Sequence, residues 1–221
     1  TGSEDSEIKN KNQTGLFEEV SDSSEIDILS EISAEKFFEK PQDLVFFEFD
    51  DQKLKILVSN FENIAEFNFM EFSKFADFFK NTKTVFFDAK ETFHKIFNAG
   101  IDFEDWGKIY DIKQLEFLLN PLMRDKSLSG IYGEKIDEDD SKVRISVMRI
   151  IFEHQQKKLE DLPRIREIAE KLDFPMSLVL FKMEKAGVEI CPEIFAKMSV
   201  EFAGEISKIE KEIFEIAGRE F

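Results

Sequence analysis

The sequence predicts an α/β protein in which a mixed sheet is flanked by helices and followed by an all-helical region. Three observations support this fold class. Short runs of β-forming residues occur between residues 44 and 87, apolar residues recur at helical spacing from residue 70 onward, and no strand pattern follows residue 141. Strands interleaved with amphipathic helices are typical of a sheet whose faces are covered by helices.

The expected strands lie in the first half of the chain. Residues 44–49 are an apolar run rich in β-formers, and residues 53–58 form a second run after a turn at 50–52. The two runs are therefore expected to pair as a hairpin. A third strand is expected around residues 65–69, and a short buried one at residues 84–87.

Apolar spacing of three to four residues, with Pro and Gly signals at the ends, predicts the helices. They are expected at residues 34–40, 72–79, 90–98, 109–119, 145–152, 163–172, 176–183 and 192–218. The last helix has the clearest pattern, because one apolar stripe runs along its whole length. The stripe consists of Phe195, Met198, Phe202, Ile206, Ile209, Ile213 and Ile216. A stripe of this kind is expected to need a partner surface.

Composition excludes several classes of protein. The chain has 221 residues, a net charge of −17 and 42% hydrophobic residues, including 26 Phe. A packed core is therefore expected, and a chain-wide basic surface for nucleic acid or anionic membrane is not. No stretch approaches the roughly 18 apolar residues of a membrane span. The single Cys191 with two histidines excludes a Cys-rich zinc site and fits a reducing, intracellular setting.

Two stretches of the chain resemble family A DNA polymerases of the bacterial DNA polymerase I type. The first matches a strand-and-helix pattern that leads to a helix ending in Leu-Leu-Asn-Pro, and comprises Thr84–Lys90, Gly100-Ile101, Tyr110–Ile112 and Leu118–Pro121. The second resembles the segment that joins the family's 3′–5′ exonuclease module to its thumb, and comprises Leu178–Ile190 and Ile213–Phe221. The resemblance implies a ribonuclease H-like exonuclease module followed by an all-helical thumb base.

Three segments are expected from this resemblance and from the composition. Residues 1–33 are polar and acidic and are expected to be a flexible tail. Residues 34–172 are expected to form a degenerate 3′–5′ exonuclease-like domain. Residues 173–221 are expected to be the start of the polymerase thumb, dominated by the long last helix.

The resemblance implies an exonuclease site in which carboxylates hold two metal ions, and each carboxylate position can be checked. The family's Asp-x-Glu motif falls on Phe46 and Glu48, and its next Asp falls on Ala89, with Asp88 one residue early. The third motif, Tyr and Asp four residues apart, falls on residues 142–146, which contain neither. The exonuclease site is therefore expected to be lost, without catalytic residues or metal ligands. Glu48 is expected to be a polar residue at the rim of the sheet.

The family's polymerase activity lies in the palm and fingers, which the resemblance places beyond Phe221. The chain alone is therefore expected to be inactive and to need no cofactor, the Mg²⁺ of the parent polymerase being bound by its palm. The expected partners are the palm and fingers, in the same or a second chain, and through them primer-template DNA. No membrane partner is expected. The bacterial cytoplasm, in association with the nucleoid, is the expected location.

The last helix carries basic residues that are candidates for contacts with DNA phosphates. These candidates are Lys208, Lys211 and Arg219. The alternative is ordinary ion pairing along the helix with Glu205, Glu212 and Glu215.

Three functions remain open from the sequence. The first is that the chain is the N-terminal part of a family A polymerase large fragment, where it supports template-directed DNA synthesis structurally. Alternatively, it is an active metal-dependent 3′–5′ exonuclease that uses the shifted carboxylates Glu48, Asp50 and Asp88. The third possibility is a stand-alone acidic interaction protein whose Phe-rich faces bind other proteins.

Overall fold

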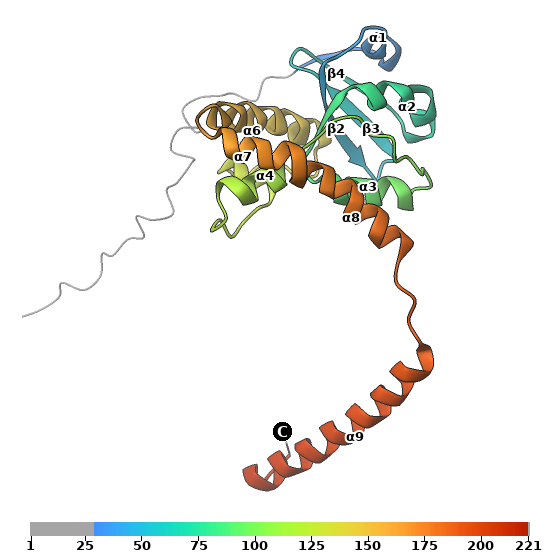
Figure 1. The fold of residues 1–221 in the computed structure, drawn as a ribbon, viewed down its shortest axis with the longest axis vertical. Coiled ribbons are helices and arrows are strands. Elements are labelled where there is room, and N and C mark those ends of the chain that lie inside the picture. The colour runs from blue at the N-terminus through green and yellow to red at the C-terminus, as the bar shows by residue number, and fades with distance from the viewer. Residues whose placement is uncertain (1–28, 221) are drawn as a thin grey trace, which may run out of the picture. The chain divides into compact units, whose positions relative to one another are not determined.

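A computed structural model describes residues 29–220 (Figure 1). The chain divides into two compact units, and the division falls between Met183 and Glu184. The first unit contains the sheet and most of the helices, and the second contains the long last helix.

A six-stranded sheet forms the centre of the first unit, in the order β1-β4-β3-β2-β5-β6. The strands are β1 (Ser30–Glu31), β2 (Leu44–Asp50), β3 (Lys55–Ser59), β4 (Asn63–Asn68), β5 (Lys83–Phe86) and β6 (Ile109–Asp111). Strand β3 pairs antiparallel with β2 and β4, whereas β5 pairs parallel with β2 and β6. The sheet is therefore mixed, and the predicted α/β fold class is confirmed.

Two strands were not predicted from the sequence. The helix expected at residues 109–119 is wrong in its first three residues, because Ile109–Asp111 form β6 beside β5. Asp111 then caps the N-terminus of the helix by accepting the backbone N–H of Gln114 at 2.9 Å. Strand β1 falls within the segment expected to be a tail and pairs parallel with β4. Residues 1–28 of that segment lie outside the described residues.

The helices cover the two faces of the sheet. They are α1 (Ala34–Phe38), α2 (Phe72–Asn81), α3 (Ala89–Asn98), α4 (Ile112–Leu119), α5 (Leu128–Tyr132), α6 (Ser141–Asp161), α7 (Pro163–Ile168) and α8 (Phe174–Ala186). A short 3₁₀ turn at Phe69–Glu71 precedes α2. Helices α2 and α3 lie on one side of the sheet and α4 and α6 on the other (Figure 1). Helix α5 lies in a region that the sequence pattern left without an element.

Side chains alternate between the two faces of β2 and so contribute to two separate hydrophobic cores. Phe47 and Phe49 face the side of α2 and α3, where Trp106 is surrounded by phenylalanine rings. Phe46 faces the other side, where it meets the ring of Phe152 on α6 at 5.4 Å. The high Phe content thus fills two aromatic cores on opposite faces of one sheet.

A π-helical turn, Ala169–Asp173, joins α7 to α8. The backbone N–H of Phe174 donates to the carbonyl of Ala169, five residues earlier, which is the pattern of a π-helix. Helix α8 then contributes Phe174 to one core and Phe181 to the other.

The second unit contains helix α9 (Pro192–Ala217), 26 residues long. Pro192 occupies its first turn, and Gly218, at φ 69°, ends it in the left-handed conformation, as the sequence predicts. No residue of α9 is buried in the described structure. Among the described residues, no helix is both long enough and apolar enough to cross a membrane.

Candidate functional site

A shallow polar cleft of about 300 Å³ lies where β2 ends. Its walls come from the β2–β3 turn, the first turn of α3 and the start of α6. Glu48, Asp50 and Asp88, the carboxylates of the alternative exonuclease site, all line this cleft. The fold therefore brings together three of the residues that the sequence singled out.

The position of the family's first carboxylate belongs to the core and not to the cleft. Residues 46, 48 and 50 share one face of β2, because side chains alternate along a strand. Phe46 is fully buried and packs edge-on against the rings of Phe61 and Phe152. An aromatic ring packed in this way has no atom that ligates a metal ion.

Glu48 is bound by an arginine. The Nε of Arg144, on α6, donates to Oε1 of Glu48 at 2.7 Å, and both side chains are largely buried. The Nη1 of Arg144 also lies 3.6 Å from Oε2 of Glu138. Burial raises the pKa of Glu48, and the nearby positive charge of Arg144 opposes this shift. Glu48 is therefore a paired carboxylate inside the cleft, which corrects the expectation of an ordinary polar residue at the sheet rim.

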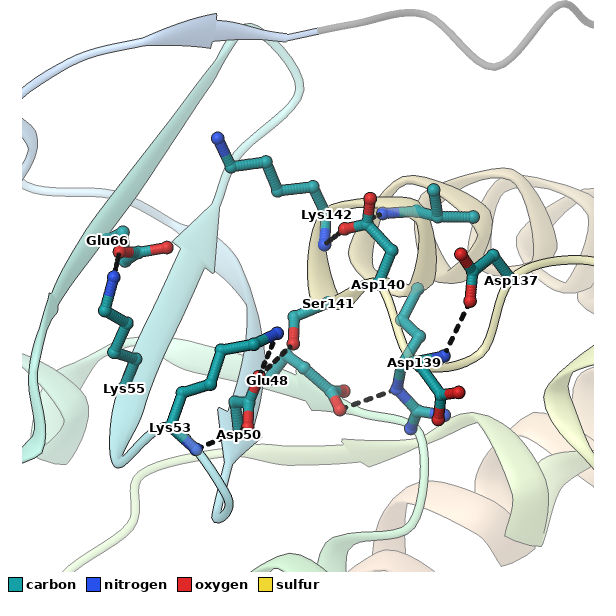
Figure 2. A network of polar contacts seen from close by, with 12 residues as sticks. Glu48, Asp50, Lys53, Lys55, Glu66, Asp137, Asp139, Asp140, Ser141 and Lys142 are labelled. Carbon is teal, nitrogen blue, oxygen red and sulfur yellow. Dashed lines mark hydrogen bonds and ion pairs between the residues drawn. The ribbon is translucent and has the colours of Figure 1, made fainter.

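Asp50 makes its contacts within the hairpin and with the start of α6. Its carboxylate accepts the backbone N–H of Lys53 at 2.9 Å and the hydroxyl of Ser141 at 3.1 Å. The Nζ of Lys53 lies 2.9 Å from the same carboxylate. Figure 2 shows Asp50 between Lys53 and Ser141, with Glu48 beside it. Asp50 thus ties the β2–β3 turn to the first residue of α6.

Asp88 and Ala89 begin helix α3. Asp88 caps the helix by accepting the N–H of Glu91 at 3.0 Å, and it pairs with Lys113 at 2.9 Å. Ala89 is fully buried and does not line the cleft. Its N–H donates to Oδ2 of Asp111 at 2.8 Å.

Asp111 is a buried carboxyl near the cleft with a strongly raised pKa. It is 1% exposed and also caps helix α4. Burial raises its pKa to about 7, despite the hydrogen bonds donated by Ala89 and Gln114 that favour the charged form. Asp111 therefore helps to hold α3 and α4 together but takes no part in lining the cleft.

The residues at the cleft do not fit the two metal ions of the family's exonuclease. Such ions need several free carboxylate oxygens at one point. The three candidate carboxylates instead bind Arg144, Lys53 and Lys113. Within residues 29–220, no group of three or more His, Cys, Asp or Glu side chains is placed to hold a metal ion.

The candidate DNA-binding residues lie in the second unit. Lys208 and Lys211 are exposed on α9, and Arg219 follows Gly218 at its C-terminal end. Helix α9 itself carries more acidic than basic residues. The three side chains therefore stay candidates.

Arg144 and Glu138 were missed by sequence reasoning. The family pattern predicts Tyr and Asp within residues 142–146 and assigns no role to a basic residue there. The signal was the Arg itself, a cation two residues before Ser146, which stands where the Asp of the third motif is expected. Its partner Glu48 lies 96 residues earlier, so only the fold reveals the pair.

Comparison with known proteins agrees with this fold. No protein-family model matches the chain. Over 169 residues the chain is 28% identical to DNA polymerase I of Streptococcus pneumoniae, a match that covers 66% of this chain and 19% of that protein. The predicted resemblance to DNA polymerase I is confirmed. The thermostable DNA polymerase I of Thermus thermophilus is 28% identical over 108 residues, which cover 48% of this chain and 13% of that protein.

A solved structure shows the same architecture. The POL domain of Pol1 from M. smegmatis, in complex with DNA primer-template and dNTP, superposes with a TM-score of 0.65 at 12% sequence identity. The match covers 80% of this chain and 34% of that one. It supports the ribonuclease H-like fold followed by helices. The chain spans less than a fifth of the length of the DNA polymerase I relatives named above.

Proposed function

We propose that the chain is the exonuclease-like module and the start of the thumb of a family A DNA polymerase, and that its proofreading site is lost. In this role it supports template-directed DNA synthesis structurally and does not cleave DNA. The palm and fingers of the same polymerase are its partners. The Mg²⁺ for synthesis is bound by the palm in this proposal.

The observation that carries this proposal is the chemistry of the cleft. The position of the first metal ligand is the buried ring of Phe46, and the remaining carboxylate of that motif, Glu48, is neutralised by Arg144. A divalent cation that approached the cleft would have to displace a buried, hydrogen-bonded guanidinium. In this proposal the module therefore lacks the side chains that would bind the two metal ions of the exonuclease reaction.

A nuclease assay tests the loss of proofreading. The purified chain is incubated with end-labelled single-stranded DNA in the presence of Mg²⁺ and, separately, Mn²⁺. We expect no shortening of the DNA with either metal. Shortening that is lost in the Glu48→Ala variant would establish the alternative, an exonuclease with shifted carboxylates. Shortening that the variant retains would indicate a contaminating nuclease.

The role proposed for the second unit is that of a thumb helix. Helix α9 is long, continuous and exposed along its apolar stripe, as expected for a helix that packs on other parts of a larger protein. Lys208, Lys211 and Arg219 are its candidate phosphate contacts. We expect weak, strongly salt-dependent DNA binding by this chain alone, because its net charge is −17.

The reading frame of the gene separates this proposal from a stand-alone interaction protein. Palm and fingers motifs encoded in frame after residue 221, or on a polypeptide that copurifies, support the polymerase assignment. A stop codon soon after residue 221, with no such copurifying polypeptide, would instead favour the interaction protein. The exposed stripe of α9 would then be its binding face.

A further inference from the structure

The cleft contains a network in which one cation bridges two segments of the chain. Arg144 contacts Glu48 on β2 and Glu138 in the segment before α6. Glu138 in turn accepts both the N–H of Ser129, at 2.9 Å, and its hydroxyl, at 2.5 Å. A continuous set of polar contacts therefore runs from the sheet through Arg144 to the start of helix α5.

A second link runs parallel to the first. Ser141, the first residue of α6, donates its hydroxyl to Asp50 on β2 at 3.1 Å. Asp140 caps the same helix by accepting the N–H of Lys142 at 2.8 Å. Figure 2 shows Asp140 and Ser141 at the end of the helix that faces Asp50 and Glu48. The start of α6 is thus fixed against the carboxylates of β2 by side chains alone.

We propose that Arg144 is the resident cation of the cleft, and that its guanidinium provides the positive charge which metal ions provide in an active exonuclease. This inference rests on the proposed function, because it explains how a module without metal ions keeps its cleft in shape. The carboxylates of Glu48 and Glu138, which do not form a metal site, instead bind the guanidinium of Arg144.

The physical reason lies in the cost of a buried carboxylate. The Glu48 side chain is largely withdrawn from water, with 12% of it exposed, so its charged form is unfavourable unless a cation lies against it. A metal ion provides that charge only while it is bound, whereas an arginine is always present and always charged. The planar guanidinium also contacts two carboxylates at once, which a lysine does less well.

Thermal unfolding of three variants, with and without millimolar Mn²⁺, tests the proposal. We expect Arg144→Met to lower Tm by roughly 5–10 °C, because Glu48 is left buried without its cation. The matched control is Lys142→Met, which removes a cation from the same helix turn that pairs with the exposed Glu31. It is expected to change Tm by about 1 °C or less.

The double variant Glu48→Leu/Arg144→Met removes the carboxylate together with its cation. We expect it to recover at least about half of the Tm lost in Arg144→Met, since a buried ion pair is often replaced by apolar groups at little cost. Mn²⁺ is expected to change the Tm of the wild type by less than about 1 °C.

Three results would overturn the proposal. They are a clear Mn²⁺ stabilisation of the wild type, a Tm loss in Arg144→Met no larger than in Lys142→Met, and additive losses in the double variant. Any of these can occur while the nuclease assay stays negative, so that the proposed function stands and this inference alone fails. A positive nuclease assay that depends on Glu48 overturns the proposed function directly.

Discussion

The cleft of the first unit and helix α9 of the second differ in where their partners come from. In the cleft, every candidate carboxylate is matched by a cation or a hydrogen-bond donor of the same chain. Along α9, large apolar side chains such as Phe202 and Ile209 are more than half exposed. The cleft pairs its candidate carboxylates within the chain, whereas α9 presents apolar surface without burying it in the described structure.

The ion pairs of the cleft stabilise the first unit itself, whereas the exposed apolar stripe of α9 would be stabilised only by packing against another surface. Under the proposed function, the cleft is a former catalytic site whose carboxylates are paired with cations of the same chain. An apolar helix face has no such partner within a short segment, because its favourable burial requires a second surface. Substitutions in the two units should therefore differ in their effect on stability.

The largest effect is expected from Trp106→Ala. Trp106 is 7% exposed and lies within 5.0–5.5 Å, between ring centroids, of Phe47, Phe79, Phe86, Phe93 and Phe103. Its removal leaves a large cavity and should cost about 3–5 kcal/mol of unfolding free energy. Urea denaturation followed by circular dichroism measures this. The control Leu122→Ala, at a side chain that is 91% exposed, should cost less than about 0.5 kcal/mol.

The second effect is a change in pH dependence in Asp111→Asn. Because burial raises the pKa of Asp111 to about 7, the folded state binds its proton more tightly than the unfolded chain does. Its contribution to stability is therefore complete below about pH 4 and is lost as the pH rises to about 7. Asn cannot titrate but still caps a helix, so this loss should disappear in the variant.

Unfolding free energies measured from pH 4 to pH 8 check this expectation. The stability of the variant relative to the wild type should rise across that range by roughly 3–4 kcal/mol, because the pKa shift spans about three units at about 1.4 kcal/mol each. Parallel pH profiles for the two proteins would show that Asp111 stays charged in the folded state, and that the interior of the first unit tolerates the charge.

The smallest effect is expected from Ile209→Ser, in the middle of the α9 stripe. Ile209 is 55% exposed, so its replacement in this chain should change the unfolding free energy by less than about 0.5 kcal/mol. In a protein where the α9 stripe packs against the rest of the polymerase, the same substitution should lower the unfolding free energy several times more. A large loss in the chain alone would mean that α9 already buries its stripe, and the contrast between the two units would be wrong.

The sequence was sufficient wherever a structural period was long enough to be recognised. Helix α6 and helix α9 repeat their apolar positions over many turns, and β2 and β3 are runs of β-formers around a turn. Strands β1 and β6 have two and three residues, too few for any period to show. They exist because neighbouring strands offer free backbone groups, which is a property of the folded sheet.

Part of the cleft was predictable because β2 is long enough to be recognised in the sequence. Comparison with the family's motifs identified Phe46 and Glu48, since these lie in a strand whose register is easily assigned. Ala89 was placed at a ligand position, yet it is buried away from the cleft against Asp111. Arg144 had no role until the fold placed it against Glu48. Contacts between segments far apart in sequence depend on topology, which local patterns do not encode.

The π-helical turn between α7 and α8 has a consequence for how this chain tolerates insertions and deletions. A turn of five residues where a helix needs about four is equivalent to one residue inserted into a continuous helix. Deleting one exposed residue there, such as Lys171, should keep the apolar faces of α7 and α8 in phase, while the segment stays kinked at Pro175, whose ring clashes with the carbonyl four residues earlier in a regular helix. The same deletion in the middle of α6 would rotate one half of its apolar face by about 100° away from the sheet. A one-residue deletion in this turn should therefore destabilise the chain less than one in α6.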